Sequence, residues 1–218
     1  MNKELEERGF IVVPNVFDSS SISKMRELSI NYFKEGNGFS NSGGVAKPDW
    51  IKEPQLVDLK SIIDFANLDE VVSSLVGQPV KFISHNDLHL NRSVGWHKDR
   101  LNGEARKYEV INPWDNSEDT MKIFKVNIYL QDHKHNNDCL TLNVGSYNQE
   151  VDTSYVVKTV HPNVGDIVVF DQRISHKASY SGGYDRLLIC MGYGVENRFF
   201  EQFKKGTEFR QNMQNGVI

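Results

Sequence analysis

The sequence predicts a mainly β fold with flanking helices, of the double-stranded β-helix type that is also called the cupin-like jelly roll. Short runs rich in β-branched and aromatic residues follow one another from about residue 80, and polar turns separate them. Before that point, apolar residues repeat at helical spacing. No helical pattern separates the later runs, which argues against a parallel sheet with crossover helices.

Length and composition indicate one soluble domain. A β-rich chain of 218 residues is most simply a single domain over 1–218. We expect a helical support over about 18–76, a jelly-roll core over about 80–195 and a C-terminal helix over about 196–213.

Charge and cysteine content limit the partners and the compartment. The net charge is −4 and no block of lysine and arginine stands out, so neither nucleic acid nor a membrane is expected as a partner. The N-terminal residues are charged and lack the apolar segment of a signal peptide. Cys139 and Cys190 lie far apart and are expected to be free thiols, so a cytoplasmic location is predicted. Oligomeric state has no sequence signature.

The N-terminal third contains the helical patterns. Residues 9–14 predict a strand that ends at a proline, and the polar residues 18–21 offer N-caps for a helix that continues to Gly36. Residues 37–50 are rich in Gly, Ser and Asn and predict an irregular loop. One further helical segment is expected from Leu56 to Gly77.

A facial metal triad is the chemistry that the strand region predicts. His97 and Asp99 lie two residues apart in the run Gly-Trp-His-Lys-Asp, and side chains at that spacing on a strand point the same way. His176 ends a second, apolar run. A His-x-Asp pair alone is more often mere exposed polarity. With a second histidine, however, it becomes the ligand set of non-haem iron(II) oxygenases, which leaves positions open for a co-substrate and oxygen.

Arg186 supports this interpretation. It follows His176 by ten residues and precedes an apolar run, so its guanidinium is expected to be buried and to need an anion. The far carboxylate of 2-oxoglutarate would suit it, because a guanidinium binds a carboxylate through two parallel hydrogen bonds. A structural ion pair with Asp185 or Asp171 is the alternative.

In these segments the sequence resembles the phytanoyl-CoA dioxygenase family of iron(II)- and 2-oxoglutarate-dependent oxygenases. The resemblance covers, in order, GFIVVPNVFDSSSI, GWHKD, VNIYLQDHKHNNDCLTLNVGSYN, VGDIVVFDQRISHKAS and Arg186. It implies that His97, Asp99 and His176 bind catalytic Fe(II), and that Arg186 binds 2-oxoglutarate. Succinate and CO2 would be released as O2 is consumed.

The chain also departs from the family pattern. Ala178 stands where some members carry a serine that contacts the co-substrate, and Ser179 is the candidate replacement. Asp138 and Tyr147 replace a glycine and a histidine of turns away from the metal ligands. Asp99 is retained, which disfavours the halogenation that members with a small residue there perform.

Further polar residues are candidates for the cavity. If the apolar face of residues 124–130 packs against the helices, Asn127 and Tyr129 point toward the co-substrate. His85, Asn86 and His89 are weaker candidates for the substrate pocket. The loop 101–118 is expected to cover the site.

The predicted function is hydroxylation of a small polar metabolite. No basic cluster suited to the phosphates of coenzyme A is present. Desaturation, cyclisation and epimerisation use the same cofactors and stay open. A non-catalytic, cupin-like binding module is the alternative of another class.

Overall fold

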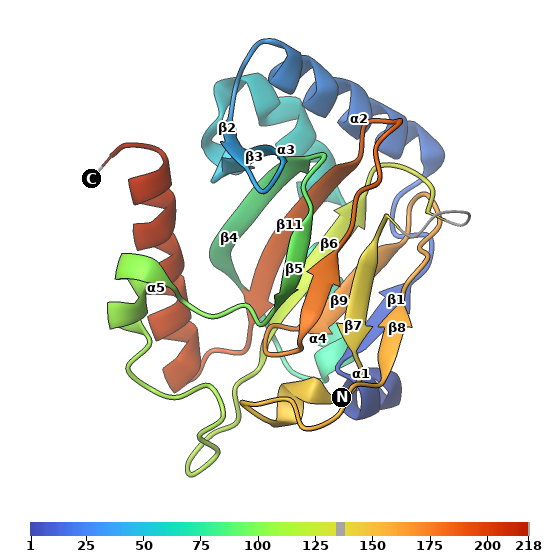
Figure 1. Ribbon diagram of the computed structural model, residues 1–218. Coiled ribbons are helices and arrows are strands. Elements are labelled where there is room, and N and C mark those ends of the chain that lie inside the picture. The colour runs from blue at the N-terminus through green and yellow to red at the C-terminus, as the bar shows by residue number, and fades with distance from the viewer. Residues whose placement is uncertain (134–137, 218) are drawn as a thin grey trace.

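The computed structural model describes residues 1–133 and 138–217, and its strands form two antiparallel sheets with helices around them (Figure 1). The α-helices are α1 (Lys3–Arg8), α2 (Ser19–Lys34), α3 (Val57–Phe65), α4 (Leu68–Val76) and α5 (Arg198–Gln214). Four short 3-10 helices are η1 (Trp50–Lys52), η2 (Pro54–Leu56), η3 (Gly103–Tyr108) and η4 (Ser146–Asn148).

The larger sheet has the strand order β1-β9-β6-β11-β4-β3-β2. Its strands are β1 (Phe10–Val13), β2 (Phe39–Asn41), β3 (Gly44–Pro48), β4 (Lys81–Leu90), β6 (Ile123–Tyr129), β9 (Ile167–Asp171) and β11 (Leu187–Gly194). The smaller sheet has the order β5-β10-β7-β8, from β5 (Val94–His97), β10 (His176–Ala178), β7 (Leu140–Asn143) and β8 (Val157–Thr159). It lies in front of the larger sheet in Figure 1. The predicted mainly β fold with flanking helices is confirmed.

Strand β6 shows how the larger sheet divides helices from cavity. Phe124, Val126, Ile128 and Leu130 belong to the same core cluster as the buried residues of α2, α3 and α4. The alternate residues face the other way, and two of them, Lys125 and Asn127, line a cavity. The apolar face of this strand therefore packs against the helices, which meets the condition set for Asn127 and Tyr129 to point away from them.

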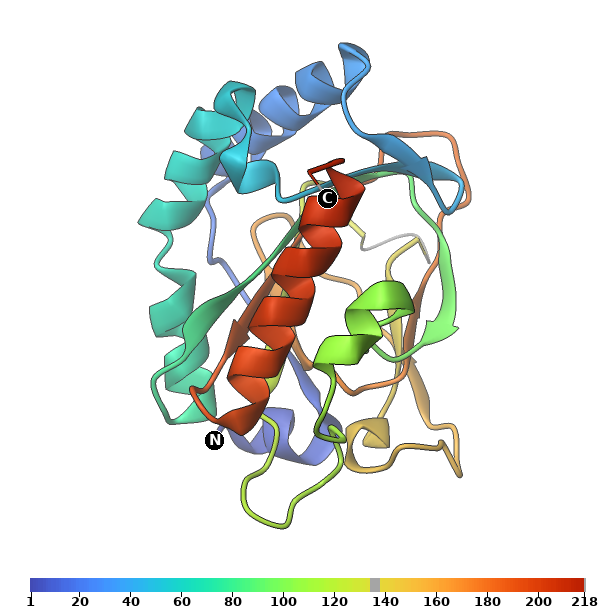
Figure 2. The ribbon, with the colours of Figure 1, turned by 90° about the vertical axis from the view of Figure 1, so that its left-hand side faces the viewer.

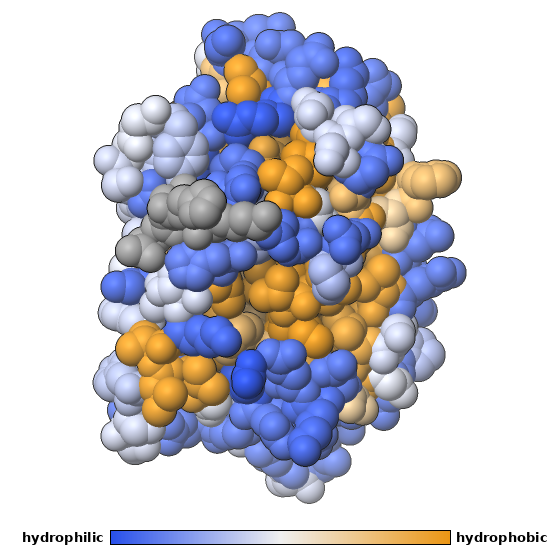
Figure 3. Space-filling view, turned by 90° about the vertical axis from the view of Figure 1, so that its right-hand side faces the viewer, coloured by the Kyte–Doolittle hydropathy of each residue, from blue (hydrophilic) through white to orange (hydrophobic). Residues whose placement is uncertain are grey.

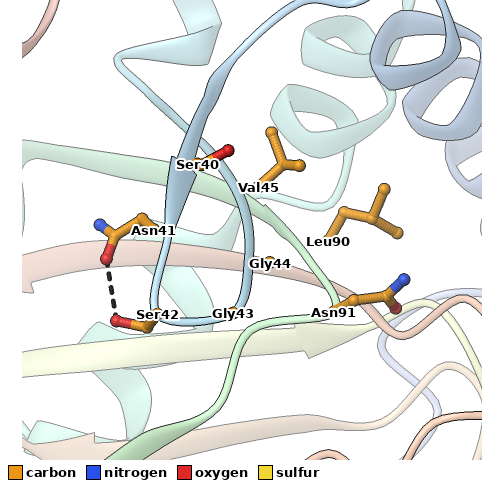
Figure 4. Close-up of a pocket in the computed structure, with 8 residues that line it drawn as sticks. All are labelled: Ser40, Asn41, Ser42, Gly43, Gly44, Val45, Leu90 and Asn91. Carbon is orange, nitrogen blue, oxygen red and sulfur yellow. Dashed lines mark hydrogen bonds between the residues drawn. The ribbon is translucent and has the colours of Figure 1, made fainter.

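Residues 37–50 are not the irregular loop that their composition predicts. They contain the hairpin β2–β3, which turns through Ser42 and Gly43, both at positive φ (51° and 78°). Such a turn matches the twist of paired strands. Figure 4 shows this hairpin over the end of β4, around a shallow hollow of about 580 Å³.

Two expected continuous elements are each divided by one asparagine at positive φ. Asn67 (φ 48°) separates α3 from α4, where a single helix from Leu56 to Gly77 was expected. Asn91 (φ 58°) ends β4 before β5 begins, although the residues read as one run. Asparagine tolerates this left-handed conformation better than most residues, so both breaks are local in origin.

The C-terminal helix covers one side of the molecule. Figure 2 shows α5 crossing that side beside η3, and α5 contacts both η3 and strand β4. Asn197 caps the helix by accepting hydrogen bonds from the N–H groups of Phe199 and Phe200. Phe199, Phe200 and Phe203 are buried against Ile83 and Ile123 of the larger sheet.

Apolar residues also reach the surface on another face. Figure 3 shows them gathered on the side that carries the outer strands β1 and β8, with hydrophilic residues around them. Val156 and Val157, at the start of β8, are each more than half exposed. None of the helices in the described part of the chain is both long and apolar enough to cross a membrane.

Candidate metal centre and cavity

A cavity of about 360 Å³ is lined by residues of both sheets, of α5 and of the segment around η3. That volume lies at the lower end of the range of ligand pockets, roughly 300–1,000 Å³. Besides its histidines, the lining contains six charged side chains, four basic and two acidic: Asp87, Arg92, Asp99, Arg100, Lys125 and Arg210. The imidazoles of His85, His89, His97 and His176 lie among them.

The three residues of the predicted triad meet at this cavity. His97 is the last residue of β5 and His176 the first of β10, and the two are register partners across the antiparallel pair. One ligand atom from each histidine and one from Asp99 lie within 4.8 Å of one another. The Nε2 atoms of His97 and His176 lie 3.5 Å and 3.9 Å from the Asp99 carboxylate.

Backbone contacts orient the triad. The Nδ1 atoms of His97 and His176 lie 2.8 Å and 3.0 Å from the carbonyl oxygens of Gly95 and Ile174. Both contacts leave Nε2 available as a ligand atom, as in protein metal sites. Asp99 lies beyond the end of β5, so the strand alternation that suggested its direction does not place it. Instead its N–H donates to the carbonyl of Gln172, whose side-chain amide donates back to the carbonyl of Asp99.

Two members of the triad are held in the protonation states that bind metals. Burial lowers the pKa of His176 to about 4, against the opposing effect of Asp99, so its imidazole is neutral. Burial would raise the pKa of Asp99, but Lys125, His176 and His97 together hold it well below its usual range. For His97, burial opposes protonation, but the hydrogen bond and charge of Asp99 together with the carbonyl of Gly95 outweigh it, so its pKa is raised.

Arg186 is buried beside this cavity without an ion pair among the described residues. Its side chain is 1% exposed, and it donates through Nε to the carbonyl of Asp138 and through Nη1 to that of Arg92. Asp171, one of the two expected ion-pair partners, pairs instead with Arg173. The Nη2 of Arg186 has no hydrogen-bond partner in the part of the chain that the structure describes. A buried guanidinium with an unused donor is costly unless a ligand accepts from it.

The other predicted co-substrate residues divide into two groups. Asn127 lines the cavity, and Tyr129 is fully buried with its ring 5.7 Å from the guanidinium of Arg186. The Asn127 Oδ1 and the Tyr129 hydroxyl both lack a hydrogen-bond partner among the described residues. Ser179 is different, since Ala178 rather than Ser179 contributes to the cavity lining.

The sequence identified the wall that β4 contributes only in part, because His85 and His89 were candidates for the pocket and Asp87 was not. His85, Asp87 and His89 alternate along this strand and all line the cavity, whereas Asn86 faces away and bonds to Asp49. The period of two was a readable signal for Asp87. Arg210 of α5 completes the wall by donating to both Asp87 carboxylate oxygens, at 3.0 Å and 3.2 Å. No local signal connects a residue so distant in sequence to this strand.

The segment after the triad contributes to the cavity as expected. Arg100, Leu101, Asn102 and Ala105 line it. Arg100 donates to Glu109 and to Glu150, so two carboxylates balance its charge. This part of the expected covering loop therefore lies over the cavity.

Comparison with solved structures gives the same architecture. The chain is similar to AviO1 from Streptomyces viridochromogenes Tue57, with 19% identity, a TM-score of 0.67, and coverage of 88% of this chain and 92% of that one. It is also similar to HygX from Streptomyces hygroscopicus with nickel and 2-oxoglutarate bound, with 18% identity, a TM-score of 0.63, and coverage of 87% and 84%. A third is SnoN, a non-heme alpha ketoglutarate dependent epimerase from nogalamycin biosynthesis, with 15% identity, a TM-score of 0.66, and coverage of 90% and 85%.

Sequence comparisons add no closer relative. No protein-family model matches the chain, and no curated protein matches it. At 15–19% identity, the three structural likenesses establish the fold. The chain has the jelly-roll fold of these proteins.

Proposed function

We propose that this protein is an Fe(II)- and 2-oxoglutarate-dependent oxygenase that hydroxylates a small polar metabolite and releases succinate and CO2. The observation that carries the proposal is the convergence of His97, Asp99 and His176 on one point of the cavity. Two histidines and one carboxylate with open positions are typical of non-haem iron(II) oxygenases.

The donor set suits iron(II). His97 and His176 would each offer Nε2, because their Nδ1 atoms are engaged with backbone carbonyls. Asp99 would supply the carboxylate. Lys125, whose ammonium lies 3.8 Å from that carboxylate, would help to keep it ionised and in position.

The buried atoms behind the triad suit 2-oxoglutarate. Arg186 Nη2 and the Tyr129 hydroxyl are donors for which the described residues provide no acceptor, and both are buried. A carboxylate accepts from both kinds of donor, so the far carboxylate of the co-substrate would satisfy them. Asn127 would offer its amide beside them, while Ser179 stays a weaker candidate.

The protein's own contribution would be binding, orientation and exclusion of water. Bound iron and 2-oxoglutarate would supply the oxidising chemistry, with O2 as the oxidant. The cavity would hold the substrate beside the triad, and η3 and α5 would limit access of water from outside. HygX, with nickel and 2-oxoglutarate bound, is a structural neighbour that supports this cofactor assignment.

Membership of the phytanoyl-CoA dioxygenase family is part of the proposal, supported by the ordered motifs around the triad and Arg186. A single domain and a cytoplasmic location are proposed on the same footing, from chain length and the two widely spaced cysteines.

Other outcomes of the same chemistry have support from the structural neighbours. SnoN is described as an epimerase and SnoK as a carbocyclase, both alpha ketoglutarate dependent. Product mass separates these outcomes. Hydroxylation adds one oxygen, desaturation and ring closure remove two hydrogens, and epimerisation leaves the mass unchanged.

The test begins with the cofactors. Protein loaded anaerobically with iron(II) is titrated with 2-oxoglutarate, and the metal-to-ligand charge-transfer absorption is followed. Oxygen is then admitted with a panel of small polar metabolites, and succinate is measured. We expect the absorption band and metabolite-dependent succinate in the wild type and neither in His97→Ala. Absence of iron and 2-oxoglutarate binding in the wild type would favour the cupin-like binding module instead.

A further inference from the structure

The cavity wall formed by β4, by the residues that follow it and by α5 carries more charge than the metal site requires. Three arginines line the cavity, and their charges can be compared one by one. Arg100 is balanced by Glu109 and Glu150. Arg210 is balanced by Asp87, with one hydrogen bond to each carboxylate oxygen.

Arg92 is the arginine of this set that forms no ion pair with a described carboxylate, although Asp87 and Asp99 act on it from a longer distance. It lies between β4 and β5, and Nη1 is 2.8 Å from Nε2 of His89. Its Nε is buried and has no hydrogen-bond partner within residues 1–133 and 138–217. A guanidinium has five N–H donors, so most of them remain for a ligand.

The histidines of the wall do not supply the missing negative charge and add no positive one. Burial lowers the pKa of His89 to about 4, against the effect of Asp87, which leaves its imidazole neutral. Burial also holds the pKa of His85 well below its usual range. With Arg210 and Asp87 cancelling, the wall carries one net positive charge, that of Arg92.

The predicted co-substrate has its own partner. Arg186 is a separate guanidinium, whose buried Nη2 has no acceptor among the described residues. Its Nη1 donates to the backbone carbonyl of Arg92, so it leaves the guanidinium of Arg92 free to bind another group. Arg92 is therefore available to a second anion. Arg92 is partly buried, and a cation that is partly removed from water without an ion-pair partner is unfavourable. An incoming carboxylate or phosphate would reduce that penalty.

We propose that the substrate of this enzyme carries one negatively charged group, a carboxylate or a phosphate, which binds Arg92. This inference rests on the proposed oxygenase function and names the substrate class within it. The cavity volume of about 360 Å³, part of which the co-substrate takes, restricts the substrate to a small molecule. Arg210, held by Asp87, adds hydrogen-bond donors to the same wall.

The experiment compares three small probes of similar size that differ in charge: butyrate, monoethyl phosphate and butyramide. Each is titrated calorimetrically into protein that is loaded anaerobically with iron(II) and saturated with 2-oxoglutarate, so that the metal and Arg186 are already occupied. We expect at least one anion to bind about tenfold or more tightly than butyramide, since charged hydrogen bonds are the stronger ones. The better of the two anions identifies the group.

Two variants assign the effect to Arg92. Arg92→Gln should remove the preference for the anion, and Arg92→Lys should restore part of it. Arg106→Gln is the charge-matched control, because Arg106 lies exposed on η3 and its loss removes the same charge from the chain. Circular dichroism checks that each variant is folded.

The outcomes separate this inference from the function on which it rests. Equal or undetectable affinity for all three probes, in protein that binds 2-oxoglutarate, would overturn the inference and leave the oxygenase standing. A loss of 2-oxoglutarate affinity in Arg92→Gln as large as in Arg186→Gln would also overturn it and assign Arg92 to the co-substrate. Failure of the wild-type protein to bind 2-oxoglutarate would contradict both the proposed oxygenase function and the inference of an anionic substrate.

Discussion

His97 and His176 face each other across the antiparallel pair β5–β10, with their ring centroids 4.2 Å apart. Nearly eighty residues separate them in the sequence, yet strand pairing brings them into register. Asp99, two residues after His97, joins them from beyond the strand end. The smaller sheet thus contributes the two histidines of the candidate metal centre, while the larger sheet contributes more of the cavity lining than the smaller one does.

Removal of a triad histidine should abolish iron binding. In His97→Ala the site keeps only two ligands, and we expect the affinity for iron(II) to fall by at least about tenfold. Equilibrium dialysis followed by metal analysis measures this. His85→Ala is the matched control, a histidine of the same cavity that lies outside the triad and should retain one iron per chain. Equal loss in both variants would contradict the assignment.

Substitution of the buried Arg186 should weaken the binding of 2-oxoglutarate and leave the binding of iron unchanged. Arg186→Gln removes charged hydrogen bonds, so we expect the Kd for 2-oxoglutarate to rise about 10- to 100-fold with iron binding unchanged. Tyr129→Phe removes one neutral hydrogen-bond donor and should raise the Kd for 2-oxoglutarate by a smaller factor. Charge-transfer titration measures both. An unchanged Kd in Arg186→Gln would exclude it as the co-substrate residue.

The hairpin β2–β3 should be sensitive to one added methyl group. A Cβ at Gly44 would lie 2.2 Å from the carbonyl oxygen of Leu90, which is backbone and cannot move aside easily. We expect Gly44→Ala to lower the free energy of unfolding by about 1–3 kcal/mol, as overpacking does. Gly95→Ala, where nothing lies within 4 Å of the added atom, is the control. Urea denaturation measures the free energy of unfolding of both variants, and an equal change in the two would contradict the prediction.

His89 should make stability depend on pH in the acid range. Burial lowers its pKa from 6.5 to about 4, so the unfolded chain binds a proton that the folded chain does not bind between those values. Its contribution is therefore lost as the pH falls from about 6.5 to 4, and stability rises with pH through that window. His89→Gln should flatten this slope. Denaturation measured at several pH values would show an unchanged slope if the imidazole were protonated in the fold.

Both cysteines should resist alkylation in the native protein. Burial raises the pKa of the Cys139 thiol to about 11 and that of Cys190 to about 12, so little thiolate forms at neutral pH. We expect iodoacetamide to modify neither residue at pH 7.5 in the folded state and both in urea. Mass spectrometry of the intact protein gives the number of modified cysteines. Rapid native labelling would mean that one thiol reaches solvent.

Local sequence patterns were sufficient to predict several helices and strands of this molecule and its candidate metal ligands. Alternation on residues 124–130 predicted which side chains of β6 meet the helices and which face the cavity, because the strand period of two is a property of the backbone. Helix α2 and helix α5 were expected close to their observed bounds, since caps and apolar spacing are local signals. The candidate ligands His97, Asp99 and His176 were also recognisable, by residue type and order.

Tertiary structure decided what local pattern could not. The alternation of a strand did not place Asp99, which is held by its backbone contacts to Gln172. Composition suggested a loop at 37–50, but pairing with β4 makes it a hairpin. The contact of Asp87 with Arg210 depends on α5 packing across β4. That the Nε of Arg92 has no hydrogen-bond partner within the described part of the chain appears only when its neighbours are in place. The sequence by itself determined the elements and the chemistry of the ligands, because both are local; the cavity and its charge arise from contacts between distant residues, which only the packed chain brings together.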